Sequence, residues 1–89
     1  MKYSDFCIVL ISGGSEVASL AVADAVIAAG FELVVISLTQ NSIFTKFKHL
    51  SFFKDLSGDI SDTSLLGQNL LSELIAISNK TDKKIAIFP

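Results

Sequence analysis

The sequence predicts an α/β protein built on an open parallel sheet, with helices covering both faces. Three short runs are hydrophobic at every position, and each is bounded by polar or turn-forming residues. Such runs are typical of strands buried on both faces, which is the usual situation in a parallel sheet. Helix-like segments separate the runs, so right-handed crossovers between parallel neighbours are expected. We therefore expect three layers and a sheet of at least three strands in the order 2-1-3.

The first half of the chain has the pattern of a βαβ unit. The run Phe6–Ile11 predicts a strand, and Ser15 is a suitable N-cap for the segment that follows it. Val17–Ala29 predicts an alanine-rich helix that ends at Gly30. This helix has no broad polar stripe, so we expect it to be covered on most sides. Leu33–Ile36 predicts the second strand.

The second half begins with a segment of mixed periodicity. Ile43–Leu56 fits neither the helical nor the strand period, and we expect a short helix followed by a short extended piece. Ser61 or Asp62 can cap the next helix, which residues 79–84 end. The third strand is predicted at Ile85–Phe88. The apolar positions of the second long helix recur at helical spacing, at Leu65, Leu66, Leu70, Leu71, Leu74, Ile75 and Ile77.

Length and composition favour one small domain that is incomplete by itself. The 89 residues allow a single domain, residues 1–89, and 51% of them are hydrophobic, which is a high share for so short a chain. We expect a truncated domain, or a chain that a partner completes: a homodimer or missing C-terminal domains. The formal charge of -2 gives no basic footprint for a nucleic-acid partner.

The same composition argues against a membrane segment and against export. The apolar stretch Val17–Ile36 has the length of a membrane span, but Asp24, Gly30 and Glu32 interrupt it. One cysteine, Cys7, excludes an intramolecular disulfide framework and favours a reducing compartment. We therefore expect a cytoplasmic location and no membrane partner.

The best candidate for ligand binding is the turn formed by Ser12, Gly13, Gly14 and Ser15. Glycines between a strand and a helix allow backbone N–H groups to approach an anion at the helix N-terminus. The alternative, with equal weight, is a plain tight turn that requires a positive φ. The turn follows a strand of a parallel sheet, and ligands bind at that edge of open α/β sheets.

The turn does not satisfy the dinucleotide fingerprint, which requires a third glycine after Gly14. Glu16 would repel a pyrophosphate at this position. The second strand ends in Ser37-Leu38-Thr39, without an acidic residue for a ribose hydroxyl. A P-loop is also missing from the sequence, because no Gly-Lys-Ser/Thr occurs.

Other polar residues indicate structure more than chemistry. In the segment from Phe44 to Lys54, aromatic and basic residues are interleaved, a pattern that can bind a phosphate or a single nucleic-acid strand. The favoured interpretation is that the aromatic side chains pack on the sheet and the lysines are solvated. His49 has no orienting partner in the sequence pattern. Asp55, Asp59 and Asp62 lack the spacing of a calcium loop, so we expect no metal site. We assign no catalytic residue.

The whole chain resembles the N-terminal domain of ATP-grasp carboxylate–amine ligases, a Rossmann-like domain that precedes the ATP-grasp fold. The resemblance lies in Ile8–Gly14, the alanine-rich helix to Gly30, the second strand to Ser37 and the closing Lys83–Pro89. It implies a domain that forms one wall of the cleft for a small-molecule carboxylate substrate and does not catalyse alone. It implies no cofactor on this segment, with ATP and Mg²⁺ held elsewhere in the full-length ligase, where an acyl phosphate is attacked by an amine.

Two alternatives remain open. The first is the family of short-chain dehydrogenase/reductases, which bind NAD(P). Their Thr-Gly-Gly-Ser segment is similar to Ser12–Ser15, and their Asp-Val-Ser/Thr-Asp segment is similar to Asp59–Asp62. However, Val17 and Ser19 stand where that family has glycines, and Ile87–Pro89 stands where it has Asn-Asn-Ala-Gly. The other alternative is a non-catalytic α/β interaction module, which the apolar excess and an open sheet edge support.

Overall fold

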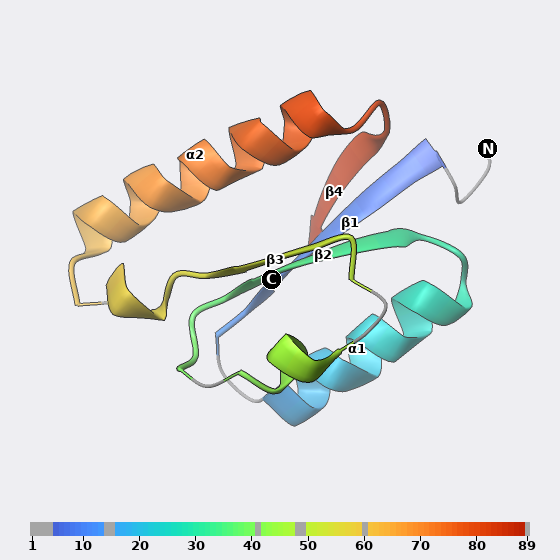
Figure 1. Cartoon of the computed structure of the whole chain (residues 1–89), viewed down its shortest axis with the longest axis horizontal. Coiled ribbons are helices and arrows are strands. Elements are labelled where there is room, and N and C mark those ends of the chain that lie inside the picture. Colours follow the sequence, from blue (N-terminus) through green and yellow to red (C-terminus); the bar gives the residue numbers. More distant parts are fainter. Residues whose placement is uncertain (1–4, 14–15, 41, 48–49, 60, 89) are drawn as a thin grey trace.

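The computed structural model describes residues 5–13, 16–40, 42–47, 50–59 and 61–88. Its described part contains a four-stranded sheet in the order β3-β2-β1-β4, and all three neighbouring pairs of strands are parallel (Figure 1). The elements in chain order are β1 (Phe6–Ser12), α1 (Glu16–Ala28), β2 (Glu32–Ser37), the 3-10 helix η2 (Ile43–Lys46), β3 (Phe52–Asp55), the 3-10 helix η3 (Ser57–Asp59), α2 (Thr63–Lys80) and β4 (Lys84–Phe88).

The predicted strand order is confirmed. The three strands expected from the sequence are β1, β2 and β4, and they lie in the order β2-β1-β4. Val9 in the middle of β1 pairs with Val34 of β2 on one side and with Ile87 of β4 on the other. The expected short helix and extended piece within Ile43–Leu56 are η2 and the edge strand β3.

The three layers follow from the direction in which the strands are added. From β1 to β2 to β3 the chain advances toward one edge, and from β3 to β4 it returns to the other side of β1. Because parallel crossovers are right-handed, connections that run in opposite directions lie on opposite faces. Figure 1 accordingly shows α1 and the short turn of η2 on one face and α2 on the other.

The face under α1 holds one half of the core. Ala23 is the one buried residue that α1 contributes to the described core, where it packs with Leu10, Leu33, Val35 and Phe44. Alanine lets the helix approach the sheet closely. The expectation that α1 is covered on most sides is wrong, because its outward positions are solvent-exposed. Most of them are alanines, whose single methyl groups make such exposure inexpensive.

The face under α2 holds the second half of the core. Cys7, Val9, Val34 and Ile36 of the sheet pack with Ile77, and other residues of the same helix face lie partly buried against them. Those partly buried helix residues recur at intervals of four, at Leu66, Leu70 and Leu74. No helix within the described residues combines the length and the apolar character needed to cross a membrane.

The ends of both helices agree with the sequence analysis. α1 ends at Ala28, and Gly30 takes a φ of 90°, a left-handed conformation that glycine adopts without strain. At the start of α2, the carboxylate of Asp62 accepts hydrogen bonds from the backbone N–H groups of Ser64 and Leu65, both at 3.1 Å. Asp62, and not Ser61, is therefore the N-cap of α2.

Asp62→Ala is expected to lower the free energy of unfolding by about 1 kcal/mol, because two N–H groups of α2 lose their acceptor. Ser61→Ala is the matched control, since this neighbour was the other candidate cap and does not cap the helix. Urea unfolding followed by circular dichroism measures both variants. Equal losses in the two variants would contradict the assignment of the cap.

Candidate functional site

The carboxyl ends of the strands form one edge of the sheet because the strands are parallel. At this edge the connection that leaves β1 lies at the point where the strand order reverses, since β2 lies on one side of β1 and β4 on the other. Ligands of open α/β sheets bind in the crevice outside such a switch point. Ser12 is the last residue of β1, so the predicted Ser12–Ser15 turn leaves the sheet at this place.

Ser12, where this turn begins, is held in place by hydrogen bonds to α1 and to the segment after β2. It is completely buried, and its hydroxyl donates a hydrogen bond to the hydroxyl of Ser19 in α1, at 3.2 Å. The backbone carbonyl of Ser12 accepts a hydrogen bond of 2.8 Å from the backbone N–H of Leu38, beyond the end of β2. The Ser12 side chain therefore connects β1 to the first turns of α1.

Gly13 is the exposed part of the turn that the structure describes. Gly30, and not Gly13, is the described glycine with a positive φ, so an unusual backbone conformation is not the reason for glycine here. A Cβ atom at Gly13 would lie 3.2 Å from Cδ1 of Leu38, which indicates limited space beside the backbone. Gly14 and Ser15, including the predicted N-cap role of Ser15, lie outside the described residues.

Glu16 joins the start of α1 to η2. Its carboxylate accepts a hydrogen bond from the hydroxyl of Ser42 and another, at 3.1 Å, from the backbone N–H of Ile43. The sequence analysis considered Glu16 only as a charge that would repel a pyrophosphate and did not predict this contact, which spans 26 residues. The one available signal was that two parallel strands end at the same edge of the sheet, so the loop after the second strand begins beside the start of the helix.

The ends of β2 and β3 satisfy their own polar groups. The Ser37 hydroxyl donates to the carbonyl of Thr39 and accepts from its N–H, both at 3.1 Å. The Asp55 carboxylate accepts a hydrogen bond of 2.8 Å from the N–H of Ser57, and hydrogen bonding by the side chain and then the backbone of Ser57 holds the pKa of Asp55 below its ordinary value. Of the acidic residues considered for a metal, Asp62 caps α2, and the side chain of Asp59 lies outside the described part.

The aromatic and basic segment is divided between core and surface. Phe44 is buried in the core under α1, and its ring lies edge-to-face against that of Phe47, with centroids 5.7 Å apart. Lys54 lies 3.8 Å from Glu73 of α2. The predicted packing of the phenylalanines is therefore confirmed for these two. Lys48 and His49 lie outside the described residues.

A surface pocket lies on η2. Its volume is about 380 Å³, and it is lined by Ser42, Ile43, Thr45 and Lys46. Glu16 hydrogen-bonds to the first two of these residues, so the pocket adjoins the start of α1. Among the described residues of this lining, Lys46 is the one with an ionisable side chain.

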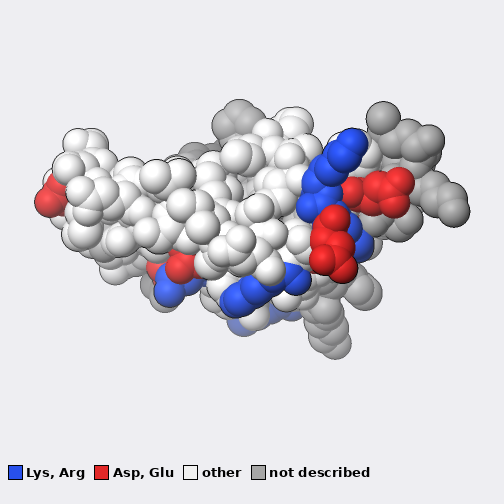
Figure 2. Space-filling model, turned by 90° about the horizontal axis from the view of Figure 1, so that it is seen from above, with Lys and Arg blue, Asp and Glu red and all other residues white. Residues whose placement is uncertain are grey.

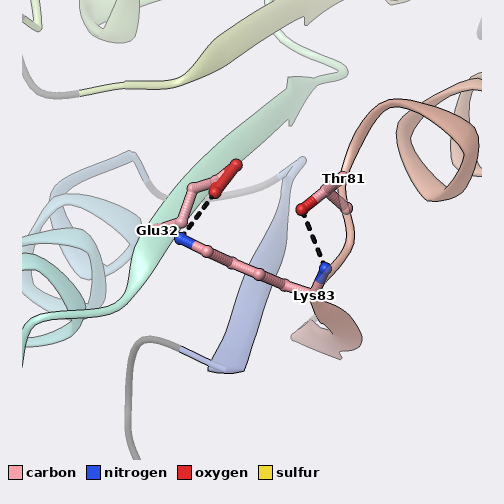
Figure 3. Close-up of polar contacts among 3 residues, drawn as sticks. All are labelled: Glu32, Thr81 and Lys83. Carbon is pink, nitrogen blue, oxygen red and sulfur yellow. Dashed lines mark hydrogen bonds and ion pairs between the residues drawn. The ribbon is translucent and has the colours of Figure 1, made fainter.

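The opposite edge of the sheet carries a second polar cluster, but its groups are paired with one another. Figure 3 shows Nζ of Lys83, which lies 2.9 Å from the carboxylate of Glu32, and the backbone N–H of Lys83, which donates to the hydroxyl of Thr81 at 3.1 Å. Nζ of Lys80 lies 5.0 Å from the centre of the Phe52 ring. A pocket of about 240 Å³ beside these residues therefore has its charges already satisfied.

Within the described residues, no group of three or more His, Cys, Asp or Glu side chains is placed to hold a metal ion. Comparison with known proteins found no matching family model, curated protein or solved structure.

Proposed function

We propose that the chain is the N-terminal, Rossmann-like domain of an ATP-grasp carboxylate–amine ligase. In this role it forms one wall of the cleft for a small carboxylate substrate and does not catalyse alone. The observation that carries the proposal is that β1 ends at Ser12, at the switch point of a parallel sheet, in a sequence that lacks a phosphate-binding motif. The strand order and the resemblance described above support the same assignment.

Glu16 separates this proposal from nucleotide binding by the chain itself. Its carboxylate is at the first residue of α1, where a dinucleotide-binding domain would place a pyrophosphate. The carboxylate also accepts hydrogen bonds from Ser42 and Ile43, and moving it away from the helix start would break both of them. In the proposed ligase, ATP and Mg²⁺ are therefore held by other domains, and this edge contributes to the binding of the acyl substrate.

An exposed apolar flank supports the interpretation as part of a larger assembly. On β4, an edge strand, Ile87 is 53% and Phe88 48% exposed, and on α2 Leu71 is 60% and Ile75 53% exposed. Charged side chains are sparse over the face that bears α2 and gather near one end of it (Figure 2). Further domains of the ligase, or a second copy of the chain, would cover this surface.

The exposed apolar residues of α2 lie toward the edge of the sheet that β4 forms. Glu73 pairs with Lys54, and Lys80 lies over Phe52, so this flank of α2 faces β3. Leu71 and Ile75 lie on the other flank of the helix, which is the side of β4. The apolar surface is thus concentrated at the β4 edge, where an extended Rossmann-like sheet would continue.

An NAD(P)-binding half of a short-chain dehydrogenase/reductase is the second candidate. The order β3-β2-β1-β4 is as compatible with it as with the ligase domain, because dinucleotide-binding sheets have the same arrangement of strands. Glu16 and the non-acidic end of β2, Ser37-Leu38-Thr39, count against it. The interaction-module alternative rests on the exposed flank alone.

Titrations of the 15N-labelled chain followed by amide chemical shifts test the proposal. Butyrate, as a simple carboxylate, is expected to shift amides at the carboxyl edge around Gly13, whereas Mg·ATP and NADH are expected to show no saturable binding. Saturable micromolar binding of NADH would overturn the proposal in favour of the dehydrogenase. Shifts with none of the three compounds would contradict a substrate-cleft role.

Gly13→Ala is expected to weaken carboxylate binding several-fold while the fold is kept. The added methyl group needs a shift of only a few tenths of an ångström in the Leu38 side chain, but it occupies the space through which a ligand approaches the backbone. Gly67→Ala is the control, because no atom outside the neighbouring backbone of α2 lies within 4 Å of the added Cβ, and α2 lies on the opposite face of the sheet from α1. Unchanged affinity in Gly13→Ala would remove the turn from the binding site.

A further inference from the structure

We propose that the pocket on η2 binds the carboxylate group of a small monoanionic ligand, with Lys46 as its cation. This inference rests on the proposed function, because it places the acyl substrate of the ligase at a particular pocket of the carboxyl edge. The lining consists of Ser42, Ile43, Thr45 and Lys46, and the volume of about 380 Å³ accommodates a small organic acid.

Two anchors hold the pocket in shape. Glu16 accepts hydrogen bonds from the Ser42 hydroxyl and the Ile43 N–H at one end of η2. Phe44, which is 1% exposed, fixes the middle of η2 in the core under α1. Within the segment, the Thr45 hydroxyl donates to the Ser42 carbonyl at 2.9 Å. The pocket is therefore preorganised, which reduces the entropic cost of binding a ligand.

Lys46 has a charge that its described neighbours do not neutralise. Lys54 and Lys83 form ion pairs with Glu73 and Glu32, and Lys80 lies over an aromatic ring. No ion pair joins Lys46 to another described residue, and it is the lysine that lines the η2 pocket. A carboxylate is the complementary partner for an ammonium group at the surface of a pocket.

The neighbouring groups restrict the ligand further. The carboxylate of Glu16 adjoins the pocket through Ser42 and Ile43, and its negative charge disfavours a polyphosphate more strongly than a single carboxylate. Ile43, which is 45% exposed, provides an apolar surface for a short alkyl group. A small carboxylic acid with an uncharged, partly apolar body satisfies both conditions.

Butyrate, butyramide and inorganic phosphate are the probes for an amide chemical-shift titration of the intact chain. Butyrate is expected to shift the amides of residues 43–46, and butyramide, which has the same shape without the charge, to bind at least about tenfold more weakly. Phosphate is expected to bind more weakly than butyrate. Equal binding of butyramide or phosphate would overturn the carboxylate assignment.

Lys46→Gln is expected to weaken butyrate binding about tenfold, whereas Lys84→Gln, which changes a lysine outside the pocket, leaves it unchanged. Retained amide spectra show that both variants are folded. Unchanged affinity in Lys46→Gln overturns the inference. If butyrate still shifts the amides around Gly13 in that variant, the proposed ligase function is unaffected and only the pocket assignment is wrong. If NADH binds while butyrate binding depends on Lys46, the ligase function is wrong and the pocket assignment stands.

Discussion

Phe44→Ala is expected to lower the free energy of unfolding by about 3–5 kcal/mol. Phe44 is 1% exposed and packs in the core cluster with Leu10, Leu33 and Val35 of the sheet. Its removal leaves a cavity beneath η2 and also loses the edge-to-face contact with Phe47. Small domains are stable by only about 5–15 kcal/mol in total, so this single change removes a large part of the stability.

Ile43→Ala is the matched control, because this neighbour on the same 3-10 helix is 45% exposed and is expected to cost less than about 1 kcal/mol. Urea unfolding followed by far-UV circular dichroism compares the two variants with the original protein. Similar losses in the two variants would show that η2 is not anchored by Phe44. The result also bears on the η2 pocket, whose shape depends on that anchor.

The strands of the sheet centre could be predicted because each is buried on both faces. The continuous runs in β1 and β2 leave no alternation to interpret, and their length excludes a long helix. β3 is different. Phe52 packs against the core under α2 and Phe53 against the core under α1, while Lys54 and Asp55 are exposed at the sheet edge. Four residues with two such environments produce no clear period, so only a short extended piece was expected.

The candidate site divides in the same way between local and long-range features. The position of the Ser12–Ser15 turn follows from a local pattern, since glycines end a hydrophobic run. Glu16 and Ser42 are 26 residues apart in the sequence, and their contact depends on the path that the chain takes between β2 and η2. No local sequence pattern predicts that path. Tertiary packing of Phe44 fixes the path. The sequence analysis favoured packing of the aromatic residues, but a segment of mixed periodicity did not show which face of the sheet this ring would cover.

The pH dependence of stability is expected to report on Cys7. This thiol is fully buried in β1, and burial, together with the nearby negative charge of Glu32, raises its pKa from 9.0 to about 11, although Lys83 opposes the shift. Because the folded pKa is higher, the unfolded chain loses its thiol proton first as the pH rises. The stabilisation is therefore complete below about pH 9 and is lost between about pH 9 and 11.

The expected loss is about 2 kcal/mol between about pH 8 and about pH 10.5, beyond the loss in a Cys7→Ala variant that has no thiol to ionise. Urea unfolding of both proteins across this range isolates the thiol, because lysine titration is common to both. The variant is expected to be the less stable protein at neutral pH, where it lacks the packed sulfur, and the gap narrows as the pH rises. Parallel curves would mean that the thiol ionises equally in both states, which is incompatible with complete burial of Cys7 between β2 and β4.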